Sequence, residues 1–147
     1  MKDALNLEVY PVCQSREFTE NLLNELHQGW LSVANALREI GVGEIATFKN
    51  LEISILDDEE MARIHGEFLN DPSPTDVMSF HHGELLISAQ VASRQALEFA
   101  SSPDREIALY GIHGMLHLAG YDDRTHEEAV IMGKRQEELL YEHFKSL

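Results

Sequence analysis

Four short stretches of the chain carry apolar residues in the alternating or clustered arrangement that is typical of strands. They lie at 7–12, 51–56, 76–80 and 84–87. The last two stretches are separated only by His81, His82 and Gly83. We therefore expect these two to form a hairpin or two neighbouring strands.

Elsewhere the apolar residues recur at helical spacing, which predicts helices over most of the remaining chain. The expected helices run over 18–40, from a cap at Asp57 to 68, and over 89–100, 103–120 and 125–144. Gly41 and Gly43 end the first helix. A turn-rich segment at 70–75 follows the second.

The residues at three helix starts agree with this assignment. Asp57 with Glu60, and Thr125 with Glu128, have the spacing of a capping box. Ser102 precedes Pro103, and proline is favoured at the first position of a helix. Because strands come early and helices late, the pattern predicts an α+β fold.

The length of 147 residues fits one domain, and we expect a single domain over residues 1–147. The chain contains no internal repeat or linker. Cys13 is its single cysteine, so an intramolecular disulfide is excluded. The N-terminal residues lack the pattern of a signal peptide, and no apolar run approaches the ~20 residues of a membrane helix. We therefore expect a cytoplasmic protein without a membrane partner.

The formal net charge is −15, with only eleven Lys and Arg residues. This charge argues against broad, sequence-independent binding to nucleic acid, which depends on neutralising phosphates. The basic residues are scattered, and only Lys134 and Arg135 are adjacent. The acidity is typical of a soluble surface.

Two histidines carry the clearest chemical signal. His113 and His117 are four residues apart on a predicted helix, so they share one face, one turn apart. Two imidazoles in this arrangement can chelate one metal ion without bending the backbone. The flanking residues are apolar, and two unliganded imidazoles would be awkward to bury among them. The pair therefore predicts a site for one zinc ion per chain.

A third ligand is expected close behind the pair. Gly120 ends the helix, because glycine tolerates the left-handed conformation at this position. The chain then turns, so a residue within 121–126 can return to the metal. Three protein ligands and one open position are the arrangement of a catalytic zinc site.

The motifs resemble those of the YbeY family, bacterial rRNA maturation factors described as single-strand-specific endoribonucleases. The family motif H-G-x-L-H-L-x-G-Y-D-H corresponds to His113-Gly-Met-Leu-His117-Leu-Ala-Gly-Tyr-Asp-Asp123. The motif P-T-D-V-L-S-F followed by G-[DE]-[IL] corresponds to residues 74–80 and 83–85. The resemblance spans roughly residues 57–139.

This resemblance implies a mixed four-stranded sheet packed with helices and a zincin-like, metal-bearing helix. It implies a metal-dependent endoribonuclease that acts on single-stranded rRNA, with the small ribosomal subunit or assembly factors as partners and no DNA. Asp123 stands at the family's third histidine, so the resemblance selects it as third ligand over Asp122 and over His126, the serious rival. No catalytic residue beyond the metal site is assigned.

Two other positions depart from the family pattern. Leu69 stands where the family has an arginine, and His81 stands where it usually has a proline. Without that arginine, a phosphate must be held in another way or not at all. This favours an alternative, a metal-stabilised ribosome-assembly factor with weak or no nuclease activity.

A metalloprotease is a distant third hypothesis. Gly114 occupies the position of the glutamate that acts as general base in H-E-x-x-H proteases. Among the other polar residues, we expect Thr75 and Asp76 to cap a turn and His81 and His82 to be loop residues. Asp122 is expected to hold the helix end or to accept a hydrogen bond from a ligand histidine.

Overall fold

The computed structural model describes residues 4–69 and 75–147. Its strands are β1 (Asn6–Pro11), β2 (Asn50–Leu56), β3 (Val77–Phe80) and β4 (Glu84–Ser88). Its helices are α1 (Glu20–Ile40), the 3-10 helix η1 (Glu44–Thr47), α2 (Asp58–Leu69), α3 (Ala89–Glu98), α4 (Pro103–Leu118) and α5 (His126–His143). Of the predicted turn at 70–75, only Thr75 lies within the described residues.

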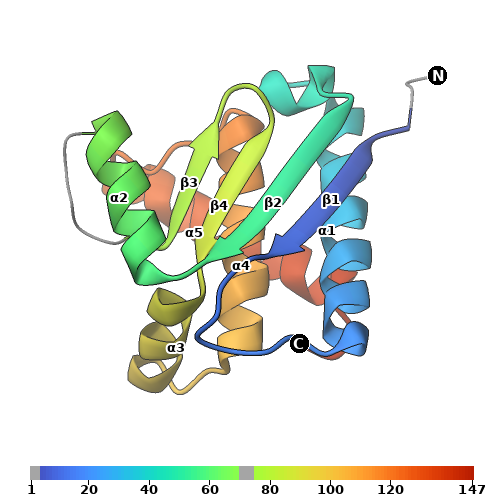
Figure 1. Ribbon diagram of the computed structural model, residues 1–147. Helices are drawn as coiled ribbons and strands as arrows, with labels where there is room; N and C mark the ends of the chain where they lie inside the picture. The colour runs from blue at the N-terminus through green and yellow to red at the C-terminus, as the bar shows by residue number, and fades with distance from the viewer. Residues whose placement is uncertain (1–3, 70–74) are drawn as a thin grey trace.

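The four strands form one mixed sheet in the order β1-β2-β4-β3. β1 pairs parallel to β2, and β2 parallel to β4, whereas β3 pairs antiparallel to β4. Helices α1, α4 and α5 lie behind the sheet in Figure 1, and α2 lies beside β3. The expected α+β class and the mixed four-stranded sheet are confirmed.

Two apolar clusters hold these layers together. The main core lies between the sheet and helices α1, α4 and α5, with Trp30, Ile53 and Ile112 among its fully buried side chains. A smaller cluster on the other face of the sheet joins Met61 of α2 to Met78 of β3. None of the helices in the described ranges is long and apolar enough to cross a membrane.

The expected capping box at the start of α2 is wrong. Oδ2 of Asp57 accepts hydrogen bonds from the backbone N–H groups of Gln14 (2.8 Å) and Ser15 (3.2 Å). The first N–H of α2, that of Asp58, donates instead to Oε1 of Gln90. The Asp57 side chain thus ties the loop after β1 to the start of α2, a long-range contact that local spacing does not reveal.

The other helix ends follow the expected signals with small shifts. α1 begins at Glu20 because Oγ1 of Thr19 accepts from the N–H of Leu22. Ser102 caps α4, and the capping box of Thr125 and Glu128 starts α5. α4 ends at Leu118, and η1 was not expected from the sequence.

Helix α4 is the central element of the fold. Eleven of its sixteen residues are buried, since it contacts α1, α3, α5 and the sheet. A Cβ atom built on Gly111 would lie 2.3 Å from Nε1 of Trp30, which donates a hydrogen bond to the carbonyl of Ala108. A Cβ atom on Gly114 would lie 2.8 Å from Cδ2 of Leu85 in β4. Two glycines therefore let α4 approach both α1 and the sheet.

We expect Gly111→Ala to destabilise the protein by about 1–3 kcal/mol, because the added methyl group would displace the Trp30 indole. Urea unfolding followed by tryptophan fluorescence measures this change. Gly133→Ala is the matched control, since nothing lies within 4 Å of its Cβ position in α5. It should gain about 0.5–1 kcal/mol from helix propensity. Equal effects of the two substitutions would contradict the close approach of α4 to α1.

Candidate metal centre and its clefts

The end of α4 turns the chain back toward its two histidines. Gly120 has a φ of 96°, the left-handed conformation predicted for it. Its N–H donates to the carbonyl of His117, and the N–H of Tyr121 donates to the carbonyl of Leu116. These two bonds form a Schellman motif, which fixes the exit of the chain from the helix. The following residues are thereby directed toward the face that carries His113.

The structure brings His113, His117 and Asp123 together. The Nε2 atoms of the two histidines are 3.1 Å apart, and Oδ2 of Asp123 lies 3.5 Å from one and 3.6 Å from the other. Donor atoms about 2.1 Å from a tetrahedral zinc ion are roughly 3.4 Å from one another. The three atoms therefore have the spacing of a tetrahedral face, and the group can bind a metal ion.

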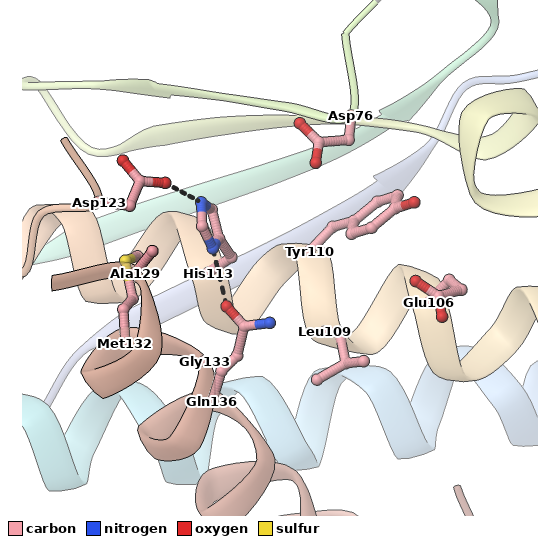
Figure 2. Close-up of a pocket in the computed structure, with 10 residues that line it drawn as sticks. All are labelled: Asp76, Glu106, Leu109, Tyr110, His113, Asp123, Ala129, Met132, Gly133 and Gln136. Atoms are coloured by element: carbon pink, nitrogen blue, oxygen red, sulfur yellow. Dashed lines mark hydrogen bonds and ion pairs between the residues drawn. The ribbon is translucent and has the colours of Figure 1, made fainter. Parts of the chain in front are cut away.

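Gln136 of α5 orients one of these histidines. Its Oε1 lies 2.7 Å from Nδ1 of His113. A dashed line marks this hydrogen bond in Figure 2. The imidazole therefore donates from Nδ1 and keeps the lone pair of Nε2 directed at the other two donor atoms. Gln136 was not predicted from the sequence, because a single glutamine on a polar helix carries no local signal of this contact.

Asp122 and His126, the rivals of Asp123 as third ligand, do not belong to this group of donor atoms among the described residues. Oδ1 of Asp122 accepts from the N–H of Asp123 at 2.8 Å, and its Oδ2 pairs with Arg124 at 3.0 Å. This differs from the expected role of Asp122 at the helix end or on a histidine. His126 is exposed as the first residue of α5, directly after the Thr125 cap.

Two clefts meet at His113. The smaller, about 290 Å³, is lined by Asp76, Glu106, Tyr110 and His113, with Gln136 at its side (Figure 2). The larger, about 440 Å³, includes Asp76, Ser79, His81, His113, His117 and Arg124 in its lining. Arg124 is the only Lys or Arg that lines either cleft within the described residues. The larger cleft thus contains the cation Arg124 beside Asp76 and Asp122, whereas the smaller cleft contains carboxylates and no Lys or Arg among the described residues.

Asp76, which was expected to cap a turn, bonds locally and also faces the clefts. Its Oδ1 accepts hydrogen bonds from its two neighbours in the chain, from the N–H of Val77 at 2.8 Å and from the hydroxyl of Thr75 at 3.4 Å. The same side chain also lines both clefts, which the sequence did not indicate. His81 and His82 are exposed and pair with Glu44 and Glu84. His81 also borders the larger cleft.

The hydroxyl of Tyr110 is buried beside the smaller cleft and has no hydrogen-bond partner among the described residues. Burial raises the pKa of Tyr110 well above its ordinary value, and the carboxylates of Glu106 and Asp76 raise it further. The phenol therefore stays protonated at every physiological pH. It presents one proton and its lone pairs in a surrounding rich in acceptors.

The position of Gly114 excludes one chemistry. A Cβ atom there would meet Leu85 at 2.8 Å and Oγ of Ser79 at 3.2 Å. The glutamate of an H-E-x-x-H protease would therefore have to enter a closely packed contact with the sheet. Leu69, the departure from the family arginine, is the last residue of α2.

The family profile described as Endoribonuclease YbeY matches residues 12–143. The chain belongs to the YbeY family. A protein named Endoribonuclease YbeY from Protochlamydia amoebophila is 33% identical over 141 residues, covering 86% of this chain and 93% of that protein. One of the same name from Bacillus thuringiensis is 33% identical over 131 residues, covering 72% and 83%.

The fold agrees with a solved structure. The solution structure of a Thermotoga maritima protein matches 92% of this chain and 90% of its own length, with a TM-score of 0.61 and 22% identity. At this identity the match concerns the fold alone. The family membership expected from the two motifs is therefore confirmed by the profile and by the relatives named above.

We expect the stability of this YbeY family member to fall as the pH rises above about 10, the ordinary pKa of tyrosine. The unfolded chain then releases the Tyr110 proton while the folded chain retains it, so the free energy of unfolding decreases with pH. Urea unfolding between pH 8 and 11 measures the slope. Tyr110→Phe should reduce this slope and change stability by less than about 1 kcal/mol at pH 8. An identical slope in both proteins would contradict the assignment.

Proposed function

We propose that this chain, as one metal-binding domain over residues 1–147, is a zinc-dependent endoribonuclease that cuts single-stranded RNA during rRNA processing. The observation that carries the proposal is the triangle of His113, His117 and Asp123 in a member of the YbeY family. Relatives bear the name endoribonuclease. Ribosome maturation places this work in the cytoplasm, with the small subunit or its assembly factors as partners.

His113, His117 and Asp123 are the residues that would hold the zinc ion, one per chain. Two imidazoles and one carboxylate are ordinary zinc ligands, and their spacing supports a tetrahedral ion. A zinc ion with an open position supplies a Lewis acid and a water of lowered pKa. Asp123 in place of a third histidine lowers the net charge of the site, so the water should be acidified less than in a three-histidine site.

The side chains around the triangle perform the remaining tasks. Gln136 holds His113 in one tautomer and orientation. Arg124, the cation that lines the larger cleft, is positioned to hold a phosphate of the RNA once Asp122 releases it. Arg124 thereby takes the phosphate-binding task that the missing arginine at position 69 leaves open.

A ribosome-assembly factor with weak or no nuclease activity is the second candidate. Leu69 in place of the family arginine and the net charge of −15 favour this candidate, because both lower the affinity for a phosphate backbone. A cleavage assay distinguishes the two candidates. The packing of Gly114 against Leu85 leaves the metalloprotease without its general base.

We expect the purified protein to contain close to one zinc ion per chain by elemental analysis. Asp123→Ala should weaken zinc binding strongly, because it removes one of three donor atoms, whereas Asp123→His should retain it. His126→Ala is the matched control and should bind zinc normally, since His126 lies outside the triangle. Zinc titrations of the three variants test the ligand set. Loss of zinc in His126→Ala with retention in Asp123→Ala would show that the ligand is misassigned.

We expect the zinc-loaded protein to cleave a labelled single-stranded RNA and to spare the same RNA in a duplex. A chelator should abolish cleavage, and added zinc should restore it. His113→Ala, purified identically, should be inactive, which excludes a contaminating ribonuclease. Arg124→Gln should raise KM more than it lowers kcat, because it removes uniform binding of a phosphate.

The cellular part of the proposal has its own readout. Depletion of the protein should leave rRNA precursors with unprocessed ends, and the His113→Ala protein should fail to correct them. Normal rRNA ends after depletion would overturn the ribosomal assignment even if the purified protein cleaves RNA. Correction by the inactive His113→Ala protein would instead support the assembly factor.

A further inference from the structure

The smaller cleft extends from His113 along one face of α4. Glu106, Tyr110 and His113 follow each other at intervals of four and three residues, so they share that face. Asp76 reaches toward them from the sheet, directly before β3, as Figure 2 shows. Glu106 lies two helical turns, about 10.5 Å along the axis, from His113. The cleft is thus acidic at the end remote from the metal centre.

Glu106 has no structural partner that accounts for its burial. Its side chain is only 8% exposed, yet it forms no hydrogen bond or ion pair with any residue of 4–69 or 75–147. An acidic residue in the first turn interacts favourably with the helix dipole, but Asp104 already does so there while half-buried and paired with Arg16. The Glu106 oxygens are not among the fully buried atoms without a partner, so they face the cleft, where a ligand that brings hydrogen-bond donors can satisfy them.

The neighbouring groups give the cleft the same preference. The Tyr110 hydroxyl also has no hydrogen-bond partner within residues 4–69 and 75–147, and the guanidinium of Arg94 is occupied by Asp58 at 2.7 and 3.2 Å. Asp76 adds a second carboxylate. Ionised carboxylates only accept hydrogen bonds, so a phosphate is repelled from this end. A ligand that fits this end of the cleft presents hydrogen-bond donors and carries no negative charge.

Among the four bases of single-stranded RNA, guanine meets these conditions best, because it presents two adjacent donors. Guanine presents N1–H and its N2 amino group side by side on the Watson–Crick edge, where one carboxylate can accept both. Adenine and cytosine place an acceptor beside their amino group, and uracil places its single N–H between two carbonyls. A volume of about 290 Å³ holds one base, and Leu109, Ala129 and Met132 provide apolar walls for its faces.

We propose that the smaller cleft is a base-recognition subsite for an unpaired guanine next to the scissile phosphate, with Glu106 and Asp76 accepting hydrogen bonds from its N1–H and N2 amino groups. The subsite rests on the proposed nuclease function. It assigns the acidic end of the cleft to the base and the side of Arg124 to the phosphate. In this arrangement, recognition of one base, rather than attraction to the phosphate backbone, determines where the protein binds along an RNA strand.

The test uses two single-stranded RNAs that differ only in one guanine or inosine among adenines and uracils. Inosine lacks the N2 amino group, so kcat/KM for cleavage beside this position should fall about tenfold in the wild-type protein. Glu106→Gln should reduce the difference to less than twofold, and Asp76→Asn should reduce it partly. Glu127→Gln, an exposed change of the same kind on α5, should leave the difference intact.

Fluorescence anisotropy with the metal-free protein separates this subsite from the nuclease function. A binding preference for guanine that Glu106→Gln removes, without cleavage by any protein, supports the subsite and overturns the nuclease. Equal cleavage and binding of the two RNAs by the wild-type protein overturns the subsite and leaves the nuclease proposal standing. A preference that persists in Glu106→Gln, or no binding of either RNA, also overturns the subsite. The wild-type comparison needs no variant to fold.

Discussion

The close approach of α4 to both of its neighbours is the constraint on which the rest of the structure depends. Gly111 leaves room for the Trp30 indole, and Gly114 leaves room for Leu85 of β4. Larger side chains would push the helix away from the sheet and move His113 relative to Asp76. The packing of the buried face of α4 therefore sets the position of the face that carries His113 and His117. Packing and function are coupled through the orientation of one helix.

The local parts of the site could be predicted from the sequence, and the distant parts could not. The spacing of His113 and His117 and the turn at Gly120 are properties of one helix and its end, so short-range rules describe them. The hydrogen bond of Gln136 to His113 and the place of Glu106 in the cleft depend on how separate elements pack, which a single sequence does not encode in any local pattern. Local spacing can also mislead. It predicts that Asp57 caps α2, but the Asp57 side chain instead accepts a hydrogen bond from the N–H of Gln14 in the loop after β1.

The positions of the charged residues say more about possible RNA binding than the net charge does. A total of −15 indicates a poor partner for a polyanion. Around the histidine pair, however, Arg124 lies on one side and the buried Glu106 on the other. The larger cleft has a cation beside Asp76 and Asp122, whereas the smaller cleft has carboxylates and no Lys or Arg among the described residues. Such a difference would favour a phosphate in the larger cleft and an uncharged base in the smaller one.

The connection between α4 and α5 is short and fixed at both ends. The Schellman motif at Gly120 holds one end, and the capping box at Thr125 holds the other, with Asp123 between them. The backbone of Asp123 is therefore placed between two helix ends whose hydrogen bonds form with the fold itself, while its exposed side chain keeps rotamer freedom of its own. A metal ion that bound there would meet a connection already shaped by these helix ends, so most of the entropy cost of ordering this segment would be met during folding.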